Sequence, residues 1–435
     1  KRLFMVSVGG FTVASMLCGA ATSLPELVLF RILQGAFGAG LVPLSQAVLL
    51  DTYPRERHGS AMAVWGMGVM VGPIVGPTLG GYITDLYNWR WVFYINLPFG
   101  VLALLGLYAF VPETVRSKER RFDFFGFTLL SVSLGALQMM LDRGETLDWF
   151  SSMEIILEAV IAGLCLYLFV VHMLTHPRPF IEPGLFRDRN LVGGMLVMFV
   201  VGIILLATMA LLPPFLQGLM GYPVTTTGIV LAPRGVGTLF AMFMVGRLIS
   251  RVDPRWMIVT GMILTMLSLW EMSGFTTAVS TAEIVKTGVI QGIGLGLVFV
   301  PLSTISFATL APRYRTEATA MFSLVRNIGS SIGISVVMGL LGEYTQVNHA
   351  VLGAGVTPLN PVMHAHMLPQ AWSLDTTAGL AALNAEINRQ ASTIAYMNDF
   401  RFMIAVAFVA IPLLLILRRP AKGGRAAPEE AVALD

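Results

Sequence analysis

Charged residues are scarce in this sequence. Asp, Glu, Lys and Arg make up only 12% of its 435 residues, whereas hydrophobic residues make up 55%. A water-soluble domain has about 25% charged residues, and half that share is too little to cover a surface exposed to water. The net charge of +3 is too small to suggest nucleic acid as a partner. The lipid bilayer is the solvent that fits such a composition.

Cysteine and the usual catalytic motifs are also scarce or missing. The two cysteines, Cys18 and Cys165, lie in apolar stretches and fit neither a disulfide framework nor a metal site. The sequence has no HExxH, GxSxG or P-loop pattern. The pair His364 and His366 lacks helical spacing and a neighbouring acid, which indicates ordinary loop histidines. We therefore predict no enzyme, no metal site and no cofactor, with an ion gradient as the energy source.

Long apolar segments are abundant, in contrast. A hydrocarbon core of about 30 Å requires roughly 20 apolar helical residues. The first segment lacks the features of a cleavable signal peptide and is interpreted as a membrane helix. Twelve segments meet the length: 3–22, 26–50, 60–84, 90–111, 124–142, 153–174, 191–215, 226–249, 256–276, 282–310, 317–341 and 400–417. These predict an all-α polytopic membrane protein.

The basic residues predict the orientation of these segments. If Lys1 is cytoplasmic, the short loops on that side contain most of the 28 Lys and Arg residues. Cytoplasmic loops carry such an excess. Both ends of the chain are therefore predicted to be cytoplasmic, and the long loop 342–399 is predicted to lie outside.

An internal repeat predicts two bundles. Gln34-Gly35 recurs as Gln291-Gly292, and Pro43 recurs as Pro301. Two similar bundles facing each other are typical of a transporter with its binding site at the interface of the repeats. We expect residues 1–111 to form the N-terminal bundle and 112–189 to add two linker helices. Residues 190–418 would form the C-terminal bundle and 419–435 a cytoplasmic tail.

The third apolar segment contains the most specific motif. Its glycines recur every four residues, so they share one helix face, on which another helix can approach closely. Two prolines in step with this row are expected to bend the helix. The alternative is ordinary tight packing. The motif consists of Gly59, Gly68, Gly72, Pro73, Gly76, Pro77, Gly80 and Gly81.

Polar side chains inside apolar segments are candidates for the transport path, because ionisable groups in membranes usually face a cavity or a partner. Arg31 and Gln34 share a helix face and could line one cavity, although a structural Arg held by carbonyls is the alternative. Glu158 is the deepest carboxylate by position, but we favour a paired or water-exposed group there. The other cavity-lining candidates are Arg326, Asn327, Gln291, Arg234 and Gln138. For them structural roles remain open, and for Gln138 a helix-contact hydrogen bond is favoured.

Several motifs resemble a known family. The spacing of the glycines and prolines from Gly59 to Gly81 resembles the antiporter motif of major facilitator superfamily drug exporters. The run from Leu27 through Arg31 to Gly35 resembles that superfamily's fourth-helix motif. Trp89-x-Trp91-x-Phe93, Met140-Leu141-Asp142-Arg143-Gly144 and Leu147-Asp148-Trp149-Phe150 are similar to the fourteen-helix drug:proton antiporters of the EmrB type.

The resemblance implies export of lipophilic drugs from a bacterial inner membrane, coupled to proton influx by alternating access. It links Arg31, with Gln34 nearby, to proton transfer. It also implies a periplasmic adaptor of the EmrA type and an outer-membrane channel of the TolC type, with the loop 342–399 as the docking element. The alternatives are a transporter of one defined metabolite, or a non-functional fragment, because family helices one and two have no counterpart before Lys1.

Overall fold

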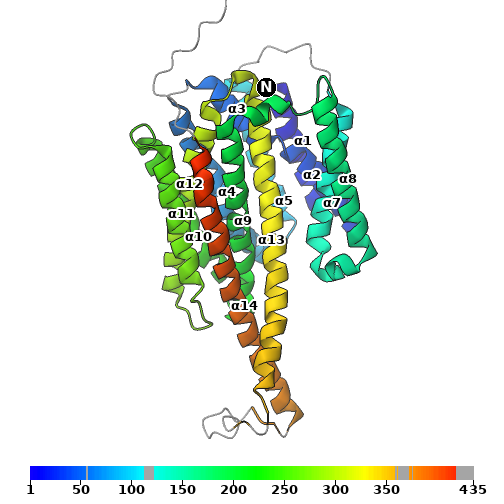
Figure 1. Ribbon diagram of the computed structural model, residues 1–435, viewed down its shortest axis with the longest axis vertical. Coiled ribbons are helices and arrows are strands. Elements are labelled where there is room, and N and C mark those ends of the chain that lie inside the picture. The colour runs from blue at the N-terminus through cyan, green and yellow to red at the C-terminus, as the bar shows by residue number, and fades with distance from the viewer. Residues whose placement is uncertain (55–56, 112–121, 358–359, 361–371, 375, 418–435) are drawn as a thin grey trace, which may run out of the picture.

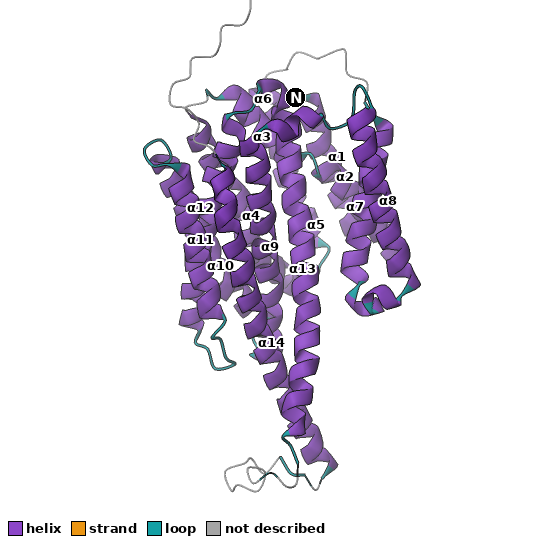
Figure 2. Cartoon of the chain, viewed as in Figure 1, coloured by secondary structure: helices purple, strands orange, loops and turns teal. Residues whose placement is uncertain are grey.

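The computed structural model describes residues 1–54, 57–111, 122–357, 360, 372–374 and 376–417. Across these ranges the chain forms helices and no strand (Figure 2). The predicted all-α fold class is confirmed. The α-helices are α1 (Arg2–Ala20), α2 (Leu24–Gly38), α3 (Leu41–Thr52), α4 (His58–Leu86), α5 (Trp91–Tyr94), α6 (Asn96–Phe110), α7 (Phe124–Arg143), α8 (Met153–Thr175), α9 (Arg189–Pro214), α10 (Val224–Leu248), α11 (Pro254–Met272), α12 (Thr281–Ala308), α13 (Arg315–Ala354) and α14 (Thr377–Leu413).

Each of the twelve predicted membrane spans corresponds to a helix or to two consecutive helices. In the described part of the chain, ten of these elements are long and apolar enough to cross a membrane, including the consecutive pairs α2–α3 and α5–α6. The other two predicted spans are α4, with 29 residues, and α11, with 19. The chain is thus a polytopic membrane protein.

Side-chain caps define the starts of several helices. The Ser23 side chain accepts a hydrogen bond from the backbone of Glu26 at the start of α2. Asp188 does the same for two backbone N–H groups of α9. Ser280 and Glu283 cap α12 reciprocally. The first backbone N–H groups of a helix have no hydrogen-bond partner within the helix. These side-chain caps supply partners for some of them at the starts of α2, α9 and α12.

The buried core lies mainly in α9 to α14, and α4 packs onto α10 and α12 from one side (Figure 1). Helix α1 packs with α2 and α6, while α7 and α8 form a separate pair. These outlying helices expose large apolar side chains such as Phe124 and Leu174, which are 73% and 67% exposed. Exposing apolar side chains to lipid costs little free energy, so we interpret these faces as lipid-facing.

Helices α10 and α12 approach each other closely at glycines. A Cβ added at Gly237 would lie 2.5 Å from the Val289 carbonyl oxygen, and one at Gly296 would lie 2.7 Å from Cβ of Ala241. A Cβ added at Gly292 would overlap the Arg234 carbonyl oxygen. Small residues of this kind let helix backbones touch in a membrane.

The segment 342–399, predicted to be a long outer loop, is largely helical in the described residues. Helix α13 continues to Ala354 and α14 begins at Thr377. The 40 residues of α13 extend about 60 Å at 1.5 Å per residue, twice the thickness of a bilayer core. Figure 1 shows the two helices projecting together past the ends of α10 and α11.

We refer to the helical residues of α13 and α14 within 342–399 as the α13–α14 extension. Polar contacts join its two helices. His349 Nε2 lies 2.9 Å from Asn384 Oδ1, and the Asn348 amide donates to the Ala391 carbonyl oxygen at 3.4 Å. The loop prediction was wrong because it followed hydropathy alone. A paired helix in water needs helix propensity and a partner, and an uninterrupted apolar sequence is not required.

Candidate functional site

Arg31 and Gln34 lie one turn apart on α2 and contact each other. Nη1 of Arg31 donates to Oε1 of Gln34 at 2.8 Å. Gln34 is buried, and Sγ of Cys18 on α1 lies 4.0 Å from the same oxygen. The Arg31 guanidinium is exposed and lies 5.8 Å from the ring centre of Phe93. Within the described residues Arg31 forms no ion pair. Its guanidinium is instead stabilised by the Gln34 amide and the Phe93 ring.

A cavity of about 240 Å³ lies between α4, α9, α10 and α12. Arg234 is the one cation among its lining residues, and it donates to the Leu205 carbonyl oxygen over a long distance of 3.4 Å. The lining is otherwise mostly apolar. It comprises Met70, Leu205, Met209, Leu212, Pro213, Gln217, Val224, Thr227, Gly228, Leu231, Ala232, Arg234, Gly235, Thr238 and Leu295. We refer to it as the apolar cavity.

The apolar cavity lies toward one end of the bundle. Its α10 lining runs from Val224 to Thr238, in the first part of that helix. In the later part of α10, α4 comes close: a Cβ added at Gly66 would lie 3.0 Å from Sδ of Met242, and one at Gly59 would lie 2.6 Å from Cγ2 of Ile249. Helices α4 and α10 therefore approach each other most closely at the far end from the cavity, while at the cavity end a Cβ added at Gly81 would lie 3.8 Å from Cγ1 of Val224.

A second cavity, of about 220 Å³, lies between α7, α9 and α13. It is lined by Gln138, Asp142, Leu206, Asn327, Ser330, Ser331 and Ile334. The Ser331 hydroxyl donates to Oε1 of Gln138 at 2.5 Å, and Nε2 of Gln138 donates to Oδ1 of Asp142 at 2.8 Å. The structure thus brings together two of the sequence candidates, Gln138 and Asn327, at one polar cavity.

Two other sequence candidates line neither cavity. Gln291 is fully buried, and its Nε2 donates to Oγ1 of Thr208 at 3.2 Å while its Oε1 has no partner among the described residues. Nη2 of Arg326 donates to Oδ1 of the adjacent Asn327 at 3.5 Å. Both residues lie within the C-terminal bundle, away from Arg31 and Gln34 on α2.

The glycine row of α4 differs from the prediction. A Cβ added at Gly68, Gly72, Gly76 or Gly80 would have no neighbour within 4 Å, so no described helix packs against this row. The contact with α10 uses another face, formed by Gly59 and by Gly66, which the sequence analysis did not select, with Gly81 also near Val224. Spacing alone does not say which of two glycine-containing faces meets a partner. The backbone stays helical through Pro73 and Pro77.

Helix α3 meets α13 at the same end as the close α4–α10 contact. Nη1 of Arg315 lies 2.8 Å from Oδ1 of Asp51, and the Thr319 hydroxyl donates to the Pro43 carbonyl oxygen at 3.2 Å. Trp65 on α4 stacks on Phe299 of α12, with ring centres 6.2 Å apart. Segments from the two sequence repeats are therefore joined at this end.

Sequence reasoning missed one buried carboxylate. Asp399 on α14 is fully buried, and neither of its oxygens has a hydrogen-bond partner in the described residues. The last predicted span began at residue 400, so Asp399 was assigned to the preceding loop. An acid directly before an apolar run was the available signal. Glu158, the deepest carboxylate by position, was expected to be paired or exposed to water, but it is 8% exposed and its Oε2 has no hydrogen-bond partner among the described residues.

Comparison with known proteins identifies similar chains. Residues 1–334 match the model of the Major Facilitator Superfamily. Multidrug export protein EmrB of Escherichia coli K12 is 34% identical over 426 residues, which cover 97% of this chain and 83% of that protein. Fatty acid resistance protein FarB of Neisseria gonorrhoeae is 32% identical over 430 residues, covering 97% of this chain and 84% of FarB.

Solved structures with a similar fold are also transporters. A bacterial homologue of the human lysosomal transporter Spinster, in an inward-facing, occupied conformation, gives a TM-score of 0.52 at 20% identity and covers 96% of this chain and 84% of its own. The human organic anion transporter MFSD10 gives a TM-score of 0.54 at 14% identity, covering 93% and 76%. At these identities the likeness supports the fold alone.

Proposed function

This chain belongs to the major facilitator superfamily, to its EmrB type, and from that premise we propose that it exports lipophilic drugs in exchange for protons. It is a transporter and not an enzyme. The drugs would move outward by alternating access while protons move inward. No cofactor is required in this proposal, because the proton gradient supplies the energy.

The apolar cavity carries the proposal. Substrate sites of transporters lie at the interface between repeats, and this cavity is bounded by α4 on one side and by α9, α10 and α12 on the other. Its lining includes Met70 and Met209, whose flexible, polarizable side chains adapt to ligands of different shape. A mostly apolar pocket with few polar groups suits amphipathic small molecules.

The positive charge of Arg234 limits the charge of the substrates that we expect the apolar cavity to bind. A guanidinium in an apolar cavity attracts an anion more strongly than it would in water, because the surroundings screen its charge weakly. It repels a cation for the same reason. We therefore expect lipophilic weak acids to be preferred over lipophilic cations. The name of the relative FarB, a fatty acid resistance protein, is consistent with an acidic lipophile.

Arg31 and Gln34 are proposed to take part in proton coupling. Their direct contact keeps the exposed Arg31 cation beside the buried Gln34 amide at the α1–α2 pair. A fixed positive charge favours the deprotonated form of any acid that approaches it and so promotes proton release. In this proposal Arg31 tunes a proton-carrying group and does not itself exchange protons.

The positions of the contacts support alternating access. With the orientation predicted from the basic residues, the Asp51–Arg315 ion pair and the close α4–α10 contact lie on the cytoplasmic side. The apolar cavity then lies in the outer half of the membrane. Loading from the cytoplasm would require these contacts to separate.

The α13–α14 extension is proposed to bind the export partners. In the proposed orientation it projects outward from a bacterial inner membrane, with both ends of the chain in the cytoplasm. Its length beyond the bilayer is about 30 Å, which is the excess of α13 over the hydrocarbon core. A periplasmic adaptor of the EmrA type, leading to a channel of the TolC type, would dock on it.

Growth inhibition in an efflux-deficient host tests the function. We expect the full-length gene to raise the minimum inhibitory concentration of lipophilic weak acids, such as phenolic uncouplers, relative to empty vector. Unchanged values for every weak acid, uncoupler and lipophilic cation tested would contradict drug export and favour a single-metabolite transporter. Arg234→Gln, expressed to the same level, should lose most of the protection against weak acids.

A further inference from the structure

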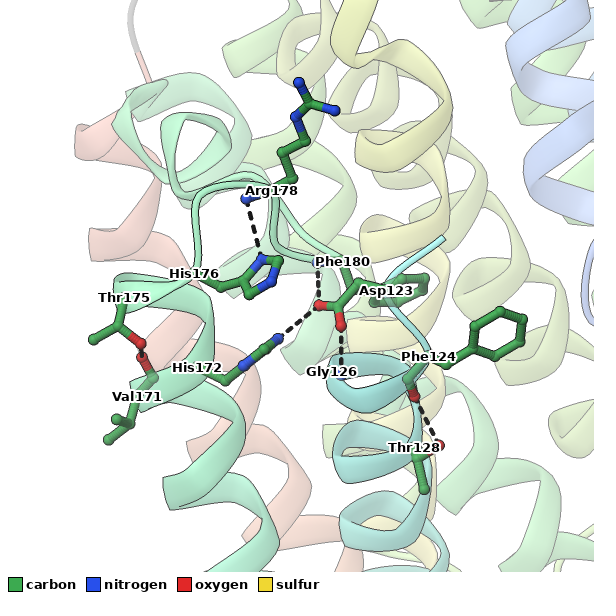
Figure 3. A network of polar contacts seen from close by, with 10 residues as sticks. All are labelled: Asp123, Phe124, Gly126, Thr128, Val171, His172, Thr175, His176, Arg178 and Phe180. Atoms are coloured by element: carbon green, nitrogen blue, oxygen red, sulfur yellow. Dashed lines mark hydrogen bonds and ion pairs between the residues drawn. The ribbon is translucent and has the colours of Figure 1, made fainter. Parts of the chain in front are cut away.

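Three side chains of the metal-ligating types meet where α7 begins and α8 ends (Figure 3). Asp123 caps the start of α7, while His172 lies in the last turn of α8 and His176 directly follows that helix. One ligand atom from each residue lies within 4.8 Å of the other two. The export mechanism proposed above uses none of these residues.

The geometry around Asp123 fixes its carboxylate. Oδ1 accepts a hydrogen bond from the Gly126 backbone at 2.9 Å, and Oδ2 accepts one from the Phe180 backbone at 2.9 Å. Nε2 of His172 lies 2.9 Å from the same Oδ2. Burial alone would raise the pKa of Asp123, but these hydrogen bonds outweigh it and hold the pKa below its usual value. The carboxylate is therefore ionised at neutral pH.

The two histidines have the spacing that metal sites on helices use. Residues four apart lie on one helix face, and the rings of His172 and His176 are 4.7 Å apart between centres. Figure 3 shows the ring of His176 next to the ring of His172 and the carboxylate of Asp123, on the side of the loop that leads to Phe180. His176 is exposed, which gives an ion a path from water.

We propose that Asp123, His172 and His176 form a binding site for Zn²⁺. Two imidazole nitrogens and one carboxylate oxygen are ligands that Zn²⁺ prefers, and three protein ligands leave a fourth, tetrahedral position for water. Ligands about 2.1 Å from the ion would lie about 3.4 Å apart. Nε2 of His172 and Oδ2 of Asp123, now 2.9 Å apart, would separate by about 0.5 Å, and the other separations, which are at most 4.8 Å, would shorten by about 1.4 Å or less.

Two present contacts must be given up on binding. The hydrogen bond between Nε2 of His172 and Oδ2 of Asp123 is lost when both atoms bind the ion, because the ring proton must then lie on Nδ1. Nδ1 of His176 accepts a hydrogen bond from the Arg178 backbone at 3.1 Å, which leaves the proton of the neutral ring on Nε2. Coordination through Nδ1 replaces that hydrogen bond directly, and coordination through Nε2 moves the ring proton to Nδ1, which then cannot accept it. The bound ion would tie the start of α7 to the end of α8 and, through Phe180, to the segment that leads into α9.

Zn²⁺ binding to the purified full chain tests the site. The protein should have an affinity tag without histidine, and it should be stripped of metal with EDTA before calorimetric titration. We expect one Zn²⁺ per chain, and we expect Co²⁺ to give the visible absorption of a tetrahedral complex. The double variant His172→Ala/His176→Ala should lose both signals. Asp123→Asn keeps a capping acceptor and should weaken binding by about 10-fold to 100-fold.

A remote histidine provides the control. His349→Ala, on α13, removes a histidine that is partly exposed, as His172 is, and should leave the stoichiometry and affinity unchanged. If the double variant does not fold, His176→Gln at the exposed position replaces it, with the Zn²⁺-induced rise in melting temperature as a second readout. Equal Zn²⁺ binding by the parent and by these variants, or no Zn²⁺ binding by the parent, would overturn the proposal.

Discussion

Arg315 on α13 forms an ion pair with Asp51 on α3, with 2.8 Å between Nη1 and Oδ1 across 264 positions of sequence. The same nitrogen donates to the Leu50 carbonyl oxygen at 2.8 Å. The Arg315 side chain is 14% exposed, whereas that of Asp51 is 53% exposed, so water screens the pair. A pair of this kind stabilises by at most about 1 kcal/mol. It joins the two repeats at the end opposite to the apolar cavity.

Asp51→Asn should favour separation of α3 from α13. Losing about 1 kcal/mol would raise the ratio of separated to joined molecules about fivefold. Spin labels at the exposed residues Thr52 and Thr316, in a cysteine-free background, report this distance by pulsed electron resonance. Asp148→Asn, at another exposed aspartate, is the matched control and should leave the distances unchanged. An unaltered distribution in Asp51→Asn would show that the pair does not hold this end closed.

Arg234→Gln should change substrate selectivity and leave folding intact. Gln keeps hydrogen-bonding capacity but removes the charge that attracts anions in the apolar cavity. We expect transport of a lipophilic weak acid in liposomes to fall at least tenfold, while transport of a neutral analogue of similar size changes less than threefold. Arg247→Gln, at the other end of α10, serves as the control. An equal loss for acid and neutral compound would argue for a structural Arg234.

Arg31→Ala should uncouple drug movement from proton movement. The substitution removes the positive guanidinium, which contacts the Gln34 amide and the Phe93 ring. We expect drug-driven proton flux in liposomes containing the full-length protein to fall at least tenfold, with drug binding largely retained. Arg401→Ala, at an exposed position of α14, is the control. Undiminished proton flux in Arg31→Ala would remove Arg31 from the mechanism.

Two glycine substitutions should have opposite effects on stability. Gly292→Ala places a methyl group against the Arg234 backbone, which cannot move away without separating α10 from α12. We expect a cost of about 2 kcal/mol or more, seen as a lower melting temperature. Gly76→Ala meets no neighbour within 4 Å and should be neutral or stabilise by up to about 1 kcal/mol. Similar losses from both would contradict the packing described here.

Shortening the α13–α14 extension should remove partner binding alone. Replacing residues 350–383 by a short Gly-Ser turn keeps the closing contact between His349 and Asn384. We expect drug transport in liposomes to persist, while recovery of an EmrA-type adaptor by pull-down falls at least tenfold. Full recovery of the adaptor would show that the docking surface lies elsewhere.

The helices were predictable because the thickness of the bilayer requires each spanning helix to be apolar over about 20 residues, and such segments can be recognised in the sequence. Arg31 and Gln34 were chosen as candidates for a related reason, since polar groups are rare in such segments, and their roles stay predictions. The helical nature of 342–399 was not predictable by this route, because beyond the bilayer hydropathy no longer separates helix from loop.

The missed residues depend on distant parts of the chain. The spacing of His172 and His176 was visible, but the third side chain, Asp123, lies 49 residues before His172. Likewise, the face of α4 that meets α10 could not be chosen from spacing, because Gly66 and Gly68 differ by only two positions and point in different directions.

The backbone contact between α10 and α12 limits how the molecule can change shape. Gly237, Gly292 and Gly296 bring the two backbones together, and rotating either helix about its axis would bring side chains into this contact. Helix α4, in contrast, meets α10 through the side chains of Met242, Ile249 and Ala63, and the flexible thioether of Met242 can change rotamer. We therefore expect α10 and α12 to move as one rigid body during transport, with the shear concentrated on the surface of α4.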